Sequence, residues 1–294
     1  MRLLEVTSDV AATRDALCFS SWGSPLTVEQ FQAREQMLRS QRWSRDVMQT
    51  WHWVDETGRV LSSCETFRMP SLVGAVEGVT FGVATVFTEQ ALRGRGAAKA
   101  MLEAVHARLS TEPGVQASIL FSEIGEALYS PLGYVGVAPF DLLFEVNEAT
   151  PKPASVRWGL ETPLPSPGDS RALQVVMTEA QLAWHHSRPR FYASMLNRTV
   201  PSEWGASTDR GSIGWTANFR TNELEVLFMR GEAPALLEAA KWAAASVGLA
   251  RVRMWETTPI EGCARVPRLN NLPMFRSFGA AFDRWAPIER ALWV

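Results

Sequence analysis

The segment Arg93-Gly94-Arg95-Gly96-Ala97-Ala98 has the residue types and spacing to hold a pyrophosphate. Its two glycines permit backbone conformations that other residues disfavour, so that consecutive N–H groups can point into one turn. An amphipathic helix is expected directly after the turn, and its N-terminus adds partial positive charge. Arg93, Arg95 and Lys99 add formal charge at the same place. The segment therefore predicts a site for a diphosphate group.

Two common phosphate-binding motifs are excluded here. A dinucleotide site needs G-x-G-x-x-G with an acidic residue about twenty positions on, and a P-loop needs Gly-Lys followed by Ser or Thr. The pattern Arg-x-x-Gly-x-Ala after the apolar run 83–88 instead resembles the acyl-CoA signature of the GNAT acetyltransferases. The resemblance implies an acetyl-CoA-dependent N-acetyltransferase in which Val86, Phe87 and Thr88 line the pantetheine arm. Backbone N–H groups near Val86 and Phe87 would then stabilise the oxyanion.

A second segment resembles the other GNAT motif. Residues 117–121 predict a short buried strand, 122–125 a turn and 126–129 a helix that ends at Leu132-Gly133-Tyr134. In the family the two motif strands splay apart, and the cofactor arm lies in the gap. The resemblance implies that Ser122 contacts the cofactor and that Tyr129 lies near the sulfur, where its hydroxyl can protonate the departing thiolate.

The general base is open among three carboxylates. Glu65 lies on a strand expected beside the cofactor strand, where it can bind the amine and accept its proton. Glu123 is an alternative that can also contact the substrate. By resemblance, some multi-domain GNAT enzymes use the C-terminal carboxylate, which falls on Val294 here.

Three sequence segments indicate which amine accepts the acetyl group. Residues 63–66, 121–129 and 184–188 resemble a GNAT subfamily that includes the fungal lysine N-acetyltransferase of lysine degradation. The resemblance implies free lysine, acetylated on its side-chain amine. An amino-acid carboxylate needs a cation, which makes His185 and Arg188 candidate substrate ligands. Another amine, such as an aminoglycoside, a polyamine or a natural-product intermediate, and a non-catalytic CoA-sensing protein are the alternatives.

The elements expected in the first half follow the GNAT order, which implies an α/β (α+β) fold with a mixed, twisted sheet. Thr27-Val28-Glu29-Gln30 matches a capping box that opens a helix to about Leu38. The residues 55–59 predict a hairpin turn between two strands. The other expected elements are a strand at 1–6, a helix from Ser8 or Asp9 to Leu17, a helix from Ala98 to Leu109 and a last strand around 135–146.

Five prolines between residues 150 and 169 predict a linker, which divides the chain into a catalytic domain 1–149, the linker 150–169 and a domain 170–294. We expect the second domain to be a degenerate GNAT copy that shapes the acceptor pocket. It has no cofactor turn of its own. Its expected elements are helices at 171–183, 184–196 and 233–247, strands at 213–219, 224–229 and 251–256, a helix end at 271–279 and a last strand at 288–294.

Composition limits the classes of partner and compartment. A net charge of −2 gives no electrostatic basis for binding nucleic acid, and no apolar run approaches the length of a membrane span. Three cysteines without metal-type spacing make a reducing cytoplasm the default. No metal is expected, because adjacent histidines on a helix point about 100° apart.

Overall fold

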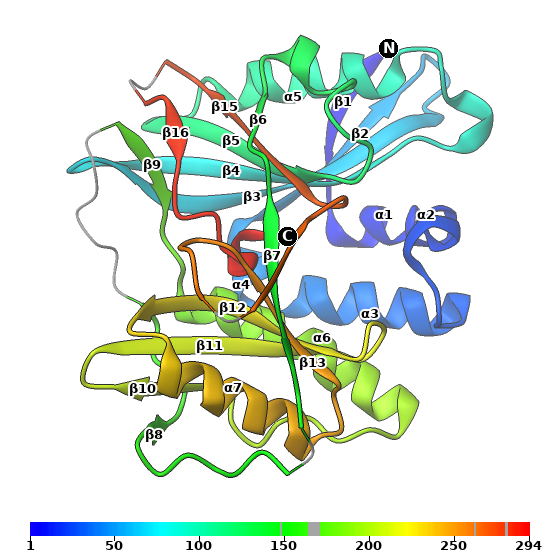
Figure 1. The fold of residues 1–294 in the computed structure, drawn as a ribbon. Helices are drawn as coiled ribbons and strands as arrows, with labels where there is room; N and C mark the ends of the chain where they lie inside the picture. The colour runs from blue at the N-terminus through cyan, green and yellow to red at the C-terminus, as the bar shows by residue number, and fades with distance from the viewer. Residues whose placement is uncertain (148, 164–170, 262, 280–281) are drawn as a thin grey trace.

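The computed structural model describes residues 1–147, 149–163, 171–261, 263–279 and 282–294. Two sheets lie one above the other, with helices between them and on their outer faces (Figure 1). The first sheet has nine strands. Seven follow the order β1 (Arg2–Val6), β2 (Met48–Val54), β3 (Val60–Val73), β4 (Val76–Phe87), β5 (Val115–Ser122), β15 (Leu272–Ser277) and β6 (Val135–Gly136). The strand β9 (Ala172–Val175) pairs with β3 and with β16 (Arg284–Trp285).

The second sheet repeats this arrangement with seven strands. Their order is β14 (Ala264–Pro267), β7 (Phe140–Glu145), β13 (Arg251–Trp255), β12 (Glu223–Gly231), β11 (Gly211–Asn218), β10 (Gly205–Thr208) and β8 (Arg157–Trp158). Each sheet contains a parallel pair, β4 with β5 and β12 with β13, and each pair is joined by a helix. The expected class, an α/β fold with mixed sheets, is confirmed.

The helices form three layers. One helix, α5 (Ala97–Leu109), covers the outer face of the first sheet, and α7 (Pro234–Ser246) covers the outer face of the second (Figure 1). Between the sheets lie α1 (Ser8–Ala12), α2 (Asp15–Trp22), α3 (Val28–Ser40), α4 (Arg42–Val47) and α6 (Glu179–Leu196). The predicted capping box at Thr27 and Gln30 is present at the start of α3. Short 3-10 turns are η1 (Gln90–Leu92), η2 (Ser130–Leu132) and η3 (Arg290–Leu292).

Each helix layer has its own apolar core. Met101, Leu102 and Val105 of α5 are fully buried against the first sheet, as their periodicity predicts. Between the sheets, Trp43 of α4 stacks on Phe67 of β3 with ring centroids 5.3 Å apart. This middle layer, which contains the C-terminal end of the chain (Figure 1), fixes α6 against the first sheet.

The two sheets exchange a strand, which corrects the expected last strand at 135–146. That segment is divided between β6 in the first sheet and β7 in the second. Pro139 lies at the break, where a residue without an N–H group cannot continue a ladder. In return β15, from the expected second domain, lies between β5 and β6. The sheets therefore do not divide at the proline-rich segment, part of which (164–170) lies outside the described residues.

Five further expectations are wrong. The single helix expected up to Leu17 is divided into α1 and α2. Residues 126–129 form a turn that continues into η2, because the positive φ of Gly125 and the nearby Pro131 oppose a helix. The expected helix at 171–183 is divided into β9 and the start of α6. The segment 271–279 contains β15. At 288–294 no strand forms, because side chains of α6 bind the carbonyl of Ala291 in place of a neighbouring strand.

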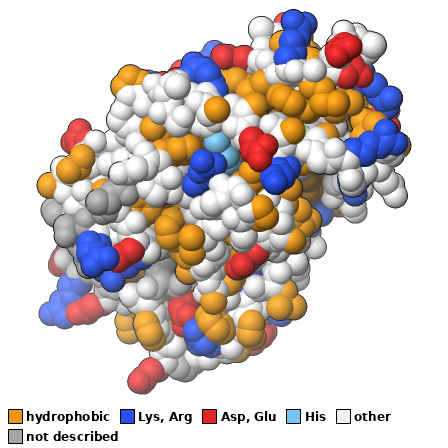
Figure 2. Space-filling view, turned by 90° about the horizontal axis from the view of Figure 1, so that it is seen from above, with side chains coloured by type: hydrophobic (Ala, Val, Ile, Leu, Met, Phe, Trp, Pro, Cys, Tyr) orange, Lys and Arg blue, Asp and Glu red, His pale blue; other side chains and the backbone are white. Residues whose placement is uncertain are grey.

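The face of the molecule above α5 carries mixed charge. Figure 2 shows basic and acidic side chains scattered among hydrophobic ones on this face. None of the helices in the described ranges combines the length and apolarity that crossing a bilayer requires.

Candidate active site

The parallel strands β4 and β5 diverge where the sequence predicts a cofactor gap. Their pairing runs from Val79 with Val115 to Val83 with Leu120 and ends there. On the other side of β4, the register with β3 is interrupted between Glu65, opposite Ala84, and Ser63, opposite Phe87. The extra residues form a bulge in which Thr85 has a φ of +47°. Positive φ in a β-branched residue is strained and indicates a constrained, functional segment.

The predicted pyrophosphate turn follows the bulge. Gly94 and Gly96 have φ values of +76° and +77°, which L side chains disfavour. Gly96 is the N-cap of α5, and no side chain caps the helix there. No atom outside the turn lies within 4 Å of the position that a Cβ would take at either glycine, so the turn is open to an incoming group. The Nε atom of Arg93 donates to the Thr88 carbonyl at 2.9 Å and ties the turn to β4.

A cavity of about 250 Å³, the acceptor cavity, opens beside the divergence of β4 and β5. It brings together predicted residues from distant parts of the chain. These are Glu65, Val86, Glu123, Tyr129, Arg188 and Val294. All three candidate bases and the candidate acid therefore lie around one space.

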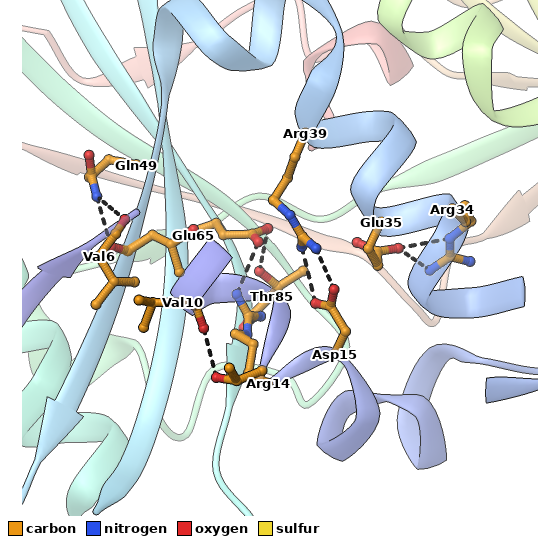
Figure 3. Close-up of polar contacts among 12 residues, drawn as sticks. Val6, Val10, Arg14, Asp15, Arg34, Glu35, Arg39, Gln49, Glu65 and Thr85 are labelled. Atoms are coloured by element: carbon orange, nitrogen blue, oxygen red, sulfur yellow. Dashed lines mark hydrogen bonds and ion pairs between the residues drawn. The ribbon is translucent and has the colours of Figure 1, made fainter. Parts of the chain in front are cut away.

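Glu65 is held by two hydrogen bonds, one to each oxygen of its carboxylate (Figure 3). The Nη1 atom of Arg14 donates to Oε1 at 3.0 Å, and the Thr85 hydroxyl donates to Oε2 at 2.8 Å. Arg14 also donates to the Thr85 carbonyl at 3.1 Å. The guanidinium thus fixes both the carboxylate and the strained bulge, and it supplies the opposite charge that a buried carboxylate requires.

Tyr129 could act as a general acid, because its hydroxyl can donate a proton. Its side chain is buried at the cavity wall, and its ring packs edge-on against Tyr134 with centroids 5.9 Å apart. Burial raises the pKa of the Tyr129 hydroxyl to about 12, with smaller contributions from Cys64 and Glu123. The hydroxyl is therefore protonated at neutral pH and can donate.

Arg188 lies on α6 between the acceptor cavity and a neighbouring one. Its guanidinium carbon lies 4.8 Å from the ring centroid of Trp293, and its buried Nε atom has no hydrogen-bond partner within the described ranges. Burial lowers the pKa of Arg188 to about 10, which leaves it charged at neutral pH. Glu123 lines both cavities and accepts a hydrogen bond from Trp22 Nε1 at 3.3 Å.

The predicted turn residues Arg93, Gly94, Arg95, Gly96, Ala97 and Ala98 do not line the acceptor cavity, and neither do four other predicted residues. The ring of Phe87 packs with Trp22 at 6.0 Å, and the Thr88 hydroxyl lies 3.0 Å from that of Ser62. The Ser122 hydroxyl donates to Gly125 O at 2.7 Å and so stabilises its own turn. His185 bonds the Ala291 carbonyl at 2.7 Å through Nε2, which leaves that atom unavailable to a ligand.

The sequence reasoning missed the charged residues that the N-terminal helices contribute. Arg14, the pair Arg39–Asp15 and the pair Arg34–Glu35 all line the acceptor cavity (Figure 3). A signal was present, because the buried positions of α3 are Phe31, Arg34, Leu38 and Arg39, which follow helical spacing. Arginines on the apolar face of a helix indicate a buried polar site. No cluster of three or more metal-ligating side chains occurs within the described residues.

Three kinds of comparison bear on this site. Residues 154–269 match the family model of the LYC1 GNAT-like C-terminal domain. A lysine acetyltransferase of Yarrowia lipolytica is 27% identical over 173 residues, which cover 50% of this chain and 44% of that relative. The chain thus spans less than half of the relative's length.

Solved structures are similar over nearly the whole chain. A probable N-acyltransferase of Enterococcus faecalis gives a TM-score of 0.59 at 14% identity, with 94% of this chain and 72% of that chain covered. A GCN5-related N-acetyltransferase of Kribbella flavida gives 0.58 at 15% identity, with 95% and 72% covered. At these identities the similarity concerns the fold.

Proposed function

We propose, from the premise that this chain has the GNAT fold and carries a LYC1 GNAT-like C-terminal domain, that it is an acetyl-CoA-dependent N-acetyltransferase of a small amine. We further propose that its acceptor is free lysine, acetylated on the side-chain amine. One observation carries the proposal: the acceptor cavity, lined by Glu65, Tyr129 and Arg188, opens where β4 and β5 diverge, and the glycine turn follows β4.

The cofactor side of the proposal is supported by backbone geometry. The turn presents unobstructed glycines and the N-terminus of α5, which together suit a diphosphate. The bulge removes Thr85 and Val86 from the β3 ladder, and Val86 reaches the cavity. Their backbone therefore suits the pantetheine arm and the carbonyl of an acyl group.

The residues around the acceptor cavity suit the two proton transfers of acyl transfer. Glu65 accepts a proton from the amine, either directly or through water, as the nitrogen bonds to the acyl carbon. Tyr129 donates its proton to the sulfur as the carbon–sulfur bond breaks. Glu123 is the second candidate base, since it lies at the same cavity.

Arg188 supports an amino acid as the acceptor. Its guanidinium is close to aromatic rings, it forms no salt bridge with a carboxylate among the described side chains, and its buried Nε has no hydrogen-bond partner there. The carboxylate of an amino acid would supply a negative charge and two acceptor oxygens.

Replacing Gly96 with valine tests the cofactor site. The φ of +77° costs an L residue about 1–2 kcal/mol, so the turn must change its conformation. A Cβ at this position meets no atom outside the turn within 4 Å, so we expect the fold to be retained. We expect acetyl-CoA affinity, measured by calorimetry, to fall at least about tenfold because the N–H groups no longer converge.

Gly248→Val is the matched control for this change. Gly248 has a φ of +68° and equally open space, but it follows α7 at the second sheet. We expect unchanged acetyl-CoA affinity in this variant. Equal affinity in the Gly96 variant and the unmodified protein would refute the cofactor site.

Lysine amide tests the acceptor. The amide lacks the carboxylate that Arg188 would bind, so we expect its kcat/KM to be at least about tenfold lower than that of lysine. Arg188→Ala should remove most of this preference, because the discrimination depends on the guanidinium. Initial rates of CoA release with the two amines measure the effect.

Arg190→Ala is the control for Arg188→Ala. Arg190 lies on the same helix, is exposed and contacts the ring of Trp204 at 5.2 Å, away from both cavities. It should keep the preference for lysine. Equal rates with lysine and its amide in the unmodified protein would refute lysine as the acceptor but not the acyl transfer.

A further inference from the structure

A second cavity of about 390 Å³ adjoins the acceptor cavity. The two share Arg34, Glu123, Arg188, Arg220 and Trp293 in their walls. Part of the second cavity is formed by the face of the second sheet that α7 does not cover. On β12, Glu223 and Glu225 alternate with Leu224 and Val226, which pack in the core with α7. The carboxylates on this face of the sheet therefore form a polar wall of the second cavity, the floor of the cavity.

The carboxylates of this floor already have partners. Arg253 donates to both oxygens of Glu223 at 2.8 and 2.9 Å and to Asp141 at 2.5 Å. The Nε atom of Arg290 donates to Glu225 at 2.9 Å. These contacts occupy both oxygens of Glu223 and one oxygen each of Asp141 and Glu225. The other oxygen of Asp141, Oδ1, has no hydrogen-bond partner within the described residues, and its nearest cation is Arg268.

Arg268 is the clearest of the guanidinium groups without an acceptor. Its side chain is 7% exposed, and its Nε lies 3.6 Å from Asp141 Oδ1, beyond hydrogen-bond distance. Neither Nε nor Nη1 has a hydrogen-bond partner within the described part of the chain, and the same holds for Nη1 of Arg290. A buried donor without an acceptor is costly, so these groups favour a ligand that supplies one.

Aromatic rings hold both guanidinium groups in place. The Arg268 guanidinium carbon lies 3.6 Å from the ring centroid of Trp255, and that of Arg290 lies 4.3 Å from Trp293. Such stacking fixes the plane of the guanidinium while its edge remains free to donate. The site is therefore organised before any ligand arrives.

The charges around the cavity are unbalanced. Six arginines line it against four carboxylates, and Arg34 is also paired with Glu35, so the excess is one positive charge in a chain whose net charge is −2. His185 does not alter this balance, because burial, with a smaller effect of Arg290, lowers its pKa well below the usual value and leaves it neutral. An excess of buried positive charge selects for an anion.

We propose that the second cavity is an anion-binding site that takes a small carboxylate-bearing molecule, held by the stacked edges of Arg268 and Arg290. A planar carboxylate matches the guanidinium fork, with two oxygens for the unsatisfied donors. The proposal does not depend on acyl transfer. Because Arg188 and Arg220 also line the acceptor cavity, the carboxylate belongs either to a separate small acid or to the far end of an elongated acceptor.

Calorimetric titration with succinate, at constant ionic strength and without acetyl-CoA, tests the proposal. We expect saturable binding to the unmodified protein with one molecule per chain. Arg268→Gln should weaken it at least about tenfold, since a charged hydrogen-bond donor is lost. Arg290→Gln provides a second variant with the same expectation, in case one of the two folds poorly.

Arg265→Gln is the matched control. Arg265 lies on β14, is half exposed, bonds Glu256 at 2.7 Å and does not line the cavity. It should bind succinate like the unmodified protein. Absence of saturable binding, or equal affinity in the Arg268, Arg290 and Arg265 variants, would overturn the proposal.

Competition distinguishes the two sources of the carboxylate. If the site holds the acid end of the acceptor, lysine and succinate should exclude each other. If it holds a separate acid, both should bind together. Either outcome leaves the anion site in place, and succinate binding would persist even in a protein that transfers no acyl group.

Discussion

Tyr129→Phe should lower turnover by about 10²–10⁴-fold while leaving acetyl-CoA affinity nearly unchanged. The change removes only the hydroxyl, whose pKa of about 12 keeps it protonated under assay conditions, so that the leaving thiolate loses its acid. Packing should persist, because the ring contact with Tyr134 does not involve the hydroxyl. Single-turnover rates of CoA release and calorimetry with acetyl-CoA measure the two quantities.

Tyr134→Phe is the matched control. The Tyr134 hydroxyl is buried, lies 2.7 Å from Ser118 Oγ and 2.9 Å from His106 Nε2, and does not line the acceptor cavity. Removing it should lower the free energy of unfolding by about 1–3 kcal/mol and leave turnover within a few fold. If Tyr129→Phe reacted at the normal rate, Tyr129 would be a packing residue.

Glu65→Gln should lower turnover by a similar factor of about 10²–10⁴. The amide retains the size of the side chain and an oxygen for the Thr85 hydroxyl, but it cannot accept the proton of the amine. It also leaves the buried guanidinium of Arg14 without its carboxylate, which should cost about 3–5 kcal/mol of the free energy of unfolding. Chemical denaturation and pre-steady-state rates measure these effects separately.

The double variant Arg14→Gln with Glu65→Gln separates chemistry from stability. It removes the unpaired charge, so the free energy of unfolding should recover part of the loss while turnover stays low. Recovery of turnover together with stability would mean that Glu65 acts through folding alone. If Glu123→Gln caused the larger loss of turnover, the base would be Glu123.

The local elements of the cofactor side could be predicted because each has a short-range cause. The glycine turn, α5 and the capping box of α3 follow from positive φ, helical periodicity and side-chain capping within a few residues. The resemblance to the GNAT acetyltransferases, drawn from this turn, agrees with the family match over residues 154–269 and with the fold of the solved structures.

The pairing of distant strands could not be predicted in the same way. The exchange of β7 and β15 depends on which sheet edges are free, and periodicity within a strand carries no such information. The segment 271–279 predicts a helix end through its similarity to the segment around Tyr129 and Gly133, yet it contains β15, and Met274 and Phe275 are buried within the sheet.

The partners of Glu65 were missed for a related reason. Arg14 lies outside any motif, between two short helices, and reaches β3 and the bulge of β4 only through the tertiary fold. The strained φ of Thr85 could not be predicted from its residue type, because threonine is common in regular strands. The sequence therefore indicated the candidate catalytic groups but not Arg14 and Thr85, the hydrogen-bond partners of Glu65.

The most direct test of the proposed reaction is to mix the protein with acetyl-CoA and one of several amines, and to measure CoA release and the acetylated product by mass spectrometry. The amines are free lysine, a polyamine and an aminoglycoside. We expect CoA and acetylated amine in equal amounts, formed fastest with lysine and carrying the acetyl group on its side-chain nitrogen. Tight binding of acetyl-CoA without release of CoA in the presence of any amine would contradict the proposed transfer and favour a protein that only binds the cofactor.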